Sequence, residues 1–203
     1  MPAWLAERGR IKKAVAGDIC EGPCAAARNT VAMYGLNDKI EVRMGNGLAI
    51  IRPGETDVII IAGMGAGTMI EIIEAGMEAA RAASLLILQP MAGAPSLRRW
   101  ANAHGWYIAD EVLVEEGRHL YEIIVLKRGH EAAVSTIAYE IGPRLLEQRP
   151  PLFQKHLAKI CGQYQKMLLN MQRSAAAKQS GKYQEIQALV QELEGLDDGG
   201  YGK

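Results

Sequence analysis

The chain has 203 residues, of which 49% are hydrophobic, and its 23 basic and 23 acidic side chains cancel at pH 7. That length and composition suit one buried core plus an appendage, and no apolar segment is long enough to cross a membrane. The N-terminal sequence MPAWLAERGRIKK has no long apolar stretch behind its charges, so we expect no secretory signal.

The first two-thirds of the chain alternates expected strands and helices. Strands are predicted at Lys12 to Asp18, Ile40 to Arg43, Val58 to Ala62 and Leu85 to Leu88, the last stopped by Pro90. Helices are predicted at Glu21 to Tyr34 before Gly35, from the glycines after Ala62 to about Ala82, and at Ser96 to His104 before Gly105. This alternation predicts an α/β protein whose mainly parallel sheet is covered on both faces.

After Gly105 the pattern changes to two β-rich runs, Val112 to Glu115 and Leu120 to Leu126. The four residues between them, EGRH, predict a β-hairpin, so the sheet is expected to end antiparallel. A parallel sheet finished in this way is typical of class I S-adenosylmethionine methyltransferases, whereas a dinucleotide-binding Rossmann domain stays parallel.

From Gly142 onward the sequence carries no strand signal. Apolar residues at three- and four-residue spacing predict a helix from Phe153 to Met171 and another from Tyr183 to Leu193. The break at Ser174 to Gly181 joins them into an antiparallel coiled-coil hairpin. We therefore expect a Rossmann-like domain at 1–141, a helical hairpin at 142–196 and a frayed tail at 197–203.

The segment Asp57 to Ile70, DVIIIAGMGAGTMI, is the most informative motif. Its apolar run predicts a buried parallel strand, and Gly63, Gly65 and Gly67 would let the backbone turn and approach a ligand just before a helix. A tight turn that binds nothing is the alternative. The dinucleotide fingerprint GxGxxG belongs on the first strand, so this GxGxG run on a late strand disfavours NAD.

Two earlier strand ends also carry residues that suit a nucleoside ligand. Asp18, followed by Ile19, could accept both hydroxyls of a ribose, although Asp is also a common helix cap. Asn46 lies between Gly45 and Gly47 and could pair with an adenine edge, although GNG alone is an ordinary turn. Three successive strand ends with such residues predict a ligand site.

The neutral total charge hides a basic segment. From Arg149 to Lys182 there are seven Lys or Arg and no acidic residue, whereas residues 1–147 carry fifteen basic and eighteen acidic residues. This pattern predicts a surface for a polyanion, with a solvated helix face as the alternative.

The three cysteines form neither a disulfide framework nor a metal motif. Their odd, low number indicates a reducing compartment, so we expect a cytoplasmic protein. An iron–sulfur pattern that begins with Cys20 and Cys24 would need a third cysteine where this chain has Ala27, so we expect no metal site.

Several motifs together resemble the bacterial TrmK/YqfN family of tRNA (adenine-N1) methyltransferases. They are VAGDICEGPCAAA (Val15 to Ala27), VRMGNGLAII (Val42 to Ile51), IAGMGAGTMIEII (Ile61 to Ile73), LILQPM (Leu86 to Met91), LRRWANAHGWYIADEVLVEEG (Leu97 to Gly117) and LYEIIVL (Leu120 to Leu126). The resemblance implies a class I domain that uses S-adenosyl-L-methionine, a C-terminal helical hairpin, and methylation of N1 of an adenine in the tRNA D-arm.

The resemblance also implies roles for particular residues. Those expected at the cofactor are Asp18, Ile19, Gly45, Asn46, Gly47, Gly63, Met64 and Gly65. Those expected at the tRNA are Gln89, Pro90, Tyr121, Lys155, Lys159, Lys166 and Arg173. For Tyr121, which could stack on a base, packing across the strands of the hairpin is the alternative. We expect tRNA as the partner of a monomer, with no membrane contact.

One departure from the family concerns the N-terminus. Family members begin with a strand and a DIGSDHAYLP-like segment, which holds the main cofactor loop and an acidic residue, whereas this sequence starts at Met1-Pro2-Ala3-Trp4. That strand belongs between the Lys12–Asp18 and Val58–Ala62 strands, so we expect both of these to have unpaired edges and assign no catalytic residue.

Two explanations of this departure stay open. Either the start is misassigned or the chain is a fragment of an active enzyme, or it is an inactive homologue that only binds tRNA. A protein-interaction module built on the helical hairpin is a further alternative.

Overall fold

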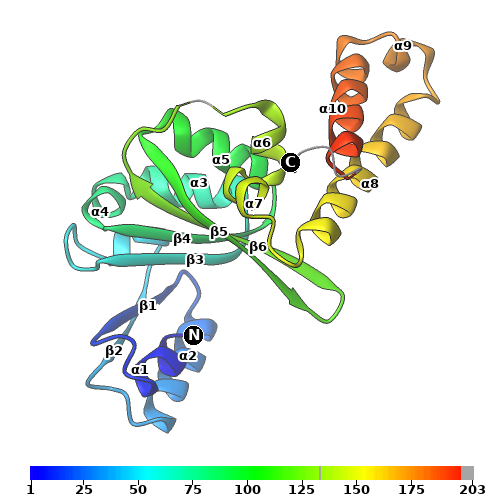
Figure 1. Ribbon diagram of the computed structural model, residues 1–203. Coiled ribbons are helices and arrows are strands. Elements are labelled where there is room, and N and C mark those ends of the chain that lie inside the picture. The colour runs from blue at the N-terminus through cyan, green and yellow to red at the C-terminus, as the bar shows by residue number, and fades with distance from the viewer. Residues whose placement is uncertain (133, 198–203) are drawn as a thin grey trace. The chain divides into compact units, whose positions relative to one another are not determined.

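The computed structural model describes residues 1–132 and 134–197. It divides into two units, one of residues 1–61 with 67–87 and one of residues 62–66 with 88 onward. Figure 1 traces the elements of both. The domain boundary expected after residue 141 stays a prediction, and the expected tail lies outside the described residues from 198 on.

The first unit begins with a two-stranded parallel sheet. Its elements in chain order are α1 (Pro2–Glu7), β1 (Ala14–Asp18), α2 (Glu21–Met33), β2 (Ile40–Met44) and the 3₁₀ turn η1 (Gly47–Ile50). β1 and β2 run in register from Ala14 opposite Ile40 to Asp18 opposite Met44, so the two strands end together. Both predicted strands and the helix before Gly35, whose φ of 62° suits a glycine, are confirmed.

The later elements differ from prediction at the glycines and at Pro90. β3 (Val58–Gly65) continues through Gly63 and Gly65, and α3 begins only at Ala66, so the turn predicted after Ala62 is wrong. The helix predicted to Ala82 is two helices, α3 (Ala66–Ala75) and α4 (Met77–Ala82), which are separated at Gly76. A Cβ on Gly76 would lie 2.3 Å from Leu48 Cβ, so the close approach of η1 explains this glycine.

β4 (Leu85–Ala92) also passes the residue predicted to stop it. Pro90 is buried inside this strand. Proline removes one backbone donor, but its fixed φ lies within the extended range, so the strand can continue beyond it.

The second sheet has the strand order β3-β4-β6-β5. β5 (Trp106–Glu116) and β6 (His119–Arg128) form the predicted antiparallel hairpin, with Trp106 opposite Arg128 and an irregularity between Ile108 and Asp110. The hairpin is longer than predicted, and its turn is Gly117 and Arg118. In the described part of the chain β1 pairs only with β2 and β3 only with β4, as the prediction of unpaired edges requires.

Between Arg128 and Asp197 the described residues form helices and no strand. They are α6 (Thr136–Ile141), α7 (Pro143–Gln148), α8 (Phe153–Met171), α9 (Ala175–Lys178) and α10 (Gly181–Asp197). A further helix, α5 (Ala94–Ala103), precedes the hairpin in the chain. Gln165 donates to Glu194 at 2.8 Å and Gln172 to Tyr183 at 3.0 Å. Gln172, at the C-terminal end of α8, contacts the earlier of these two α10 residues, so the two helices run antiparallel.

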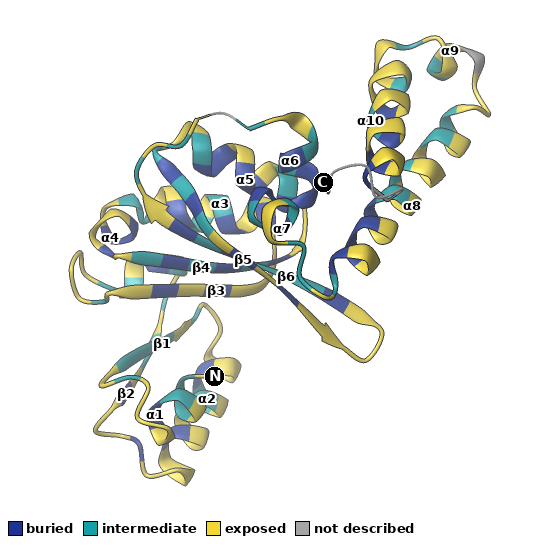
Figure 2. Ribbon diagram, in the orientation of Figure 1, coloured by how far each residue is buried: buried dark blue, intermediate teal, exposed yellow. Residues whose placement is uncertain are grey.

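The first half of α8 is anchored in the core of the second unit. Figure 2 shows burial concentrated there, and the buried residues are Phe153, His156, Leu157 and Ile160. The three apolar ones pack in one cluster with Leu113 and Leu120 of the hairpin and with Leu193 and Leu196 of α10. α8 is therefore held by the hairpin at one end, and its second half extends from the core.

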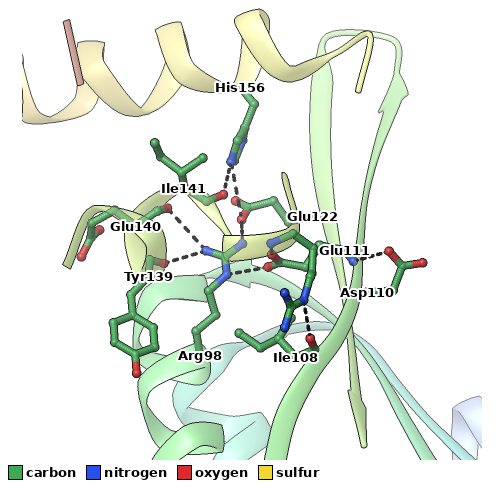
Figure 3. Close-up of polar contacts among 10 residues, drawn as sticks. Arg98, Ile108, Asp110, Glu111, Glu122, Tyr139, Glu140, Ile141 and His156 are labelled. Carbon is green, nitrogen blue, oxygen red and sulfur yellow. Dashed lines mark hydrogen bonds and ion pairs between the residues drawn. The ribbon is translucent and has the colours of Figure 1, made fainter. Parts of the chain in front are cut away.

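A fully buried guanidinium joins the elements around this core (Figure 3). Arg98 of α5 donates from Nε to Glu111 Oε1 and from Nη2 to Glu122 Oε2, both at 2.7 Å. Nη1 donates to the carbonyl of Tyr139 at 3.0 Å. One side chain thus ties α5 to both hairpin strands and to α6.

The electrostatics of this cluster keep Arg98 charged and His156 neutral. Burial alone would lower the pKa of Arg98, but the carboxylates of Glu111 and Glu122 raise it above its ordinary value. Burial lowers the pKa of His156, although Glu122 lies 3.9 Å away. Its Nε2 donates to the Ile141 carbonyl at 2.8 Å, and Nδ1 has no hydrogen-bond partner among the described residues.

Gly142 is required by this cluster, and its replacement tests it. Its φ is 112°, and a Cβ there would lie 2.7 Å from Glu111 Oε2 and 2.8 Å from Arg98 Nη2. We expect Gly142→Ala to lower the free energy of unfolding by about 3 kcal/mol or more, because it strains the backbone and displaces a buried ion pair. Denaturant unfolding measures this.

Gly162→Ala is the matched control. Gly162 is exposed inside α8, and a Cβ there would meet nothing within 4 Å, so this change should stabilise the helix by up to about 1 kcal/mol. Equal effects of the two substitutions would contradict the role given to Gly142.

The lowered pKa of His156 predicts a pH dependence of stability. Below pH 6.5 His156 is protonated in the unfolded chain, while its lowered pKa keeps it neutral in the folded chain. The free energy of unfolding is therefore highest above that pH and falls as the pH decreases. The slope from this one proton is at most about 1.4 kcal/mol per pH unit. His156→Gln keeps a donor for Ile141 and should flatten the curve between about pH 7 and 5 in urea unfolding. The exposed His130, changed to Asn, is the control and should leave the slope as in the wild type.

Candidate functional site

Asp18 ends β1 with one carboxylate oxygen available. Its Oδ1 accepts the Cys20 N–H at 2.8 Å, and α2 begins at Glu21 with Cys20 as its cap residue, so Asp18 is not the helix cap. Oδ2 has no partner in the described part of the chain. The next residue, Ile19, is 63% exposed. An acceptor and an apolar side chain therefore lie next to each other at this strand end.

The glycines that flank Asn46 are explained by packing within the first unit. A Cβ on Gly45 would lie 2.6 Å from Ile50 Cγ2, and one on Gly47, whose φ is 53°, would lie 3.0 Å from Ile72 Cγ2. Gly45 N–H donates to the Asp18 carbonyl at 2.9 Å, which brings the predicted residues of these two strand ends together. The Asn46 side chain does not cap η1, so its amide is the group left for a ligand.

The glycines of β3, in the second unit, have a different environment. A Cβ on Gly63 or Gly65 would meet nothing within 4 Å, although the φ of 78° at Gly63 favours glycine. Gly63 N–H donates to Gln89 Oε1 at 3.0 Å, so the structure brings these two predicted residues together. Met64, between the glycines, is 40% exposed. This strand end has open space where a ligand can approach the backbone.

A groove of about 780 Å³ lies in the second unit, between the end of β4, α5, the hairpin turn with the start of β6, α6 and α8. It brings together four of the predicted tRNA residues, Pro90, Tyr121, Lys155 and Lys159. Gln89 lies instead beside a hollow of about 400 Å³, which it shares with Met91 and Tyr121. Lys166 and Arg173 are exposed at and beyond the second half of α8, outside the groove lining.

The groove also holds four charged residues that the sequence analysis did not assign to a site, namely Arg99, Arg118, Glu122 and Glu140. Its described lining includes the cations Arg99, Arg118, Lys155 and Lys159 and the carboxylates Glu122 and Glu140. Lys159 Nζ donates to the Leu120 carbonyl at 3.1 Å, and Lys155 pairs with Glu115. The two adjacent arginines of LRRW could have indicated a basic site, but the sequence does not show which of them lines the groove. The excess of cations makes this groove a candidate site for an anion.

The sequence also led to predictions about metal binding and membrane-spanning segments. Over residues 1–132 and 134–197 no three His, Cys, Asp or Glu side chains gather as a metal site would require. Cys24 is buried, with its Sγ 3.5 Å from the Asp18 carbonyl, and Cys20 is exposed. None of the described helices is long and apolar enough to cross a membrane.

Comparison with known proteins relates this arrangement to one family. The sequence model of the family "TrmK: tRNA (adenine(22)-N(1))-methyltransferase" matches residues 1–195. The tRNA (adenine(22)-N(1))-methyltransferase of Bacillus subtilis (strain 168) is 32% identical over 98% of this chain and 84% of its own length.

Solved structures give the same result. The crystal structure of the B. subtilis m1A22 tRNA methyltransferase TrmK is 30% identical with a TM-score of 0.83, over 95% of this chain and 86% of that one. A candidate tRNA (m1A22) methyltransferase of Streptococcus pneumoniae, in complex with S-adenosyl-L-methionine, is 32% identical with a TM-score of 0.80, over 97% and 86%.

Proposed function

The chain belongs to the TrmK family of tRNA (adenine(22)-N(1))-methyltransferases, and from this membership we propose which of its residues hold the cofactor and the RNA. It is an enzyme that transfers a methyl group from S-adenosyl-L-methionine to N1 of an adenine in the tRNA D-arm. Its fold is the Rossmann-like methyltransferase fold with a mixed sheet. The match over residues 1–195 carries this conclusion, and it favours the enzyme over an inactive tRNA-binding homologue or an interaction module.

The residues at the strand ends fit the cofactor. The free Oδ2 of Asp18 can accept ribose hydroxyls, and the amide of Asn46, between Gly45 and Gly47, can pair with the adenine edge. Ile19 offers an exposed apolar surface for the same nucleoside. The open space at Gly63 and Gly65 leaves room for a ligand against the backbone. These are the roles that we propose for them.

The reaction depends more on the alignment of the target base with the methyl donor than on a strong catalytic base. S-adenosyl-L-methionine, when bound, supplies an electrophilic methyl group on a sulfonium sulfur. Adenine N1 carries its own lone pair, so the residues around it have to orient the base and exclude water. We propose that Gly63, Met64 and Gly65, together with Gln89 and Pro90, line the transfer site. Because N1 lies on the Watson–Crick edge, the target adenine has to be unpaired or extruded.

The basic surface of α8 is the proposed RNA arm. Lys155 and Lys159 line the groove, and Lys166 and Arg173 continue the basic character along and just beyond the second half of the helix. We propose that α8 and α10 act as a coiled-coil hairpin at 142–196, beside a methyltransferase domain at 1–141, with Tyr121 near the target base. We also propose that the protein works as a monomer in the cytoplasm.

The role of Asp18 can be tested without disturbing its turn. Asp18→Asn keeps an oxygen for the Cys20 N–H but removes the charge, so we expect the Kd for S-adenosyl-L-homocysteine to rise about tenfold or more. Titration calorimetry measures this, with the exposed Asp38→Asn as the control in the same unit. Equal affinities of the two variants would remove Asp18 from the site.

The RNA arm can be tested by charge reversal. Lys166→Glu and Lys159→Glu should each weaken tRNA binding and reduce the slope of log K against log salt by about 0.7 to 0.9 for every phosphate that is no longer neutralised. Filter binding over a salt series measures both. Lys127→Glu reverses an exposed charge on β6 outside the groove lining and serves as control. A slope unaltered in all three variants would count against α8 as the RNA arm.

A further inference from the structure

Glu140 is a buried carboxylate in the lining of the basic groove, and donors from two other helices meet on it. Its side chain, on α6, is 7% exposed. Oε1 accepts from Arg99 Nη2 of α5 at 2.6 Å, and Oε2 accepts from the Tyr164 hydroxyl of α8. Both carboxylate oxygens are therefore occupied, as a buried carboxylate requires.

Arg99 is oriented by these contacts yet open to the groove. Its side chain is 43% exposed, and the guanidinium carbon lies 5.3 Å from the centre of the Tyr139 ring. Glu140 uses one Nη2–H group, and among the described residues this guanidinium has no other hydrogen-bond or ion-pair partner. The remaining donors keep the fork geometry that suits a phosphate.

Tyr164 remains a donor at physiological pH. Burial raises the pKa of its hydroxyl above the ordinary value, and the hydrogen bond to Glu140 raises it further. The proton therefore stays on Tyr164, and α8 holds the carboxylate that orients Arg99.

The charges around Arg99 favour a polyanion over a single small anion. Arg118, Lys155 and Lys159 line the same groove, and Lys159 is held in place by the Leu120 carbonyl. A site with several cations spread along one groove suits successive phosphates of an RNA backbone.

We propose that Arg99 binds a phosphate of the tRNA backbone and that Glu140 and Tyr164 are positioning residues that hold its guanidinium toward the groove. This assignment rests on the proposed function, because it takes tRNA as the ligand of the groove. Because the ion pair and the hydrogen bond hold the side chain in place before binding, less conformational entropy is lost when the phosphate is bound. The competing explanation is that Arg99, Glu140 and Tyr164 have only the structural role of joining α5, α6 and α8.

The test compares Arg99→Ala, Arg99→Lys and Tyr164→Phe with unmodified tRNA. Arg99→Ala should raise the tRNA Kd about tenfold and lower the salt slope by about 0.7 to 0.9, because one phosphate is no longer neutralised. Its KM for tRNA should rise, with kcat and the affinity for S-adenosyl-L-homocysteine unchanged. Tyr164→Phe keeps the charge, so its Kd should rise roughly threefold with the wild-type salt slope.

The double variant separates positioning from structure. If Tyr164 acts through Arg99, Tyr164→Phe should not weaken tRNA binding further once Arg99→Ala is present. Arg28→Ala is the matched control, because it removes an exposed Arg–Glu pair of 2.7 Å in the first unit. Arg99→Lys retains a cation but not the fork, so an intermediate Kd with an unchanged slope supports the proposal even where Arg99→Ala lowers the Tm.

Two results would overturn the proposal, and they differ in meaning. If Arg99→Ala binds tRNA with the same Kd and salt slope as the wild type, the Arg99–Glu140 pair has only a structural role, and the proposed function stays intact. Intact S-adenosyl-L-homocysteine binding without any tRNA binding by the wild type would overturn the proposed function, and this assignment with it.

Discussion

The buried guanidinium of Arg98 is the interaction on which the second unit depends. A buried cation costs several kcal/mol unless carboxylates and carbonyls surround it, and here the partners come from β5, β6 and α6. Loss of either carboxylate would leave a buried N–H group of this guanidinium without an acceptor, which is costly in the core. The contacts of this one side chain therefore join α5, the hairpin and α6, which all contribute residues to the groove.

The same residues connect this core to the groove. Glu122 neutralises Arg98 from one side and lines the groove on the other. The backbone carbonyl of Glu140 lies 3.4 Å from Arg98 Nη1, while its side chain holds Arg99 and Tyr164. Two residues of the groove lining are thus held by contacts with the core, and α8 is attached beside them by the hydrogen bond between His156 and the Ile141 carbonyl.

Local sequence signals predicted most elements, and the misses have tertiary causes. The apolar runs of the strands and the short hairpin turn are local features, so their positions could be predicted. β3 continues to Gly65, although glycine disfavours strands, because β4 supplies hydrogen bonds that no local pattern shows. Arg98 and Arg99 are adjacent in sequence, and their side chains point about 100° apart around α5. Their partners are carboxylates far away in the sequence, so the sequence alone does not show that Arg98 is buried while Arg99 faces the groove.

The two glycine motifs show what sequence could and could not establish about the site. GNG and GMG are equally permissive as sequences, so both were predicted to admit a ligand. In the structure Gly45 and Gly47 are glycines because Ile50 and Ile72 leave no room for a Cβ, whereas at Gly63 and Gly65 that room is open. The ligand chemistry of the first motif therefore depends on the Asn46 amide and the nearby Asp18 carboxylate, while at β3 it depends on the exposed backbone itself.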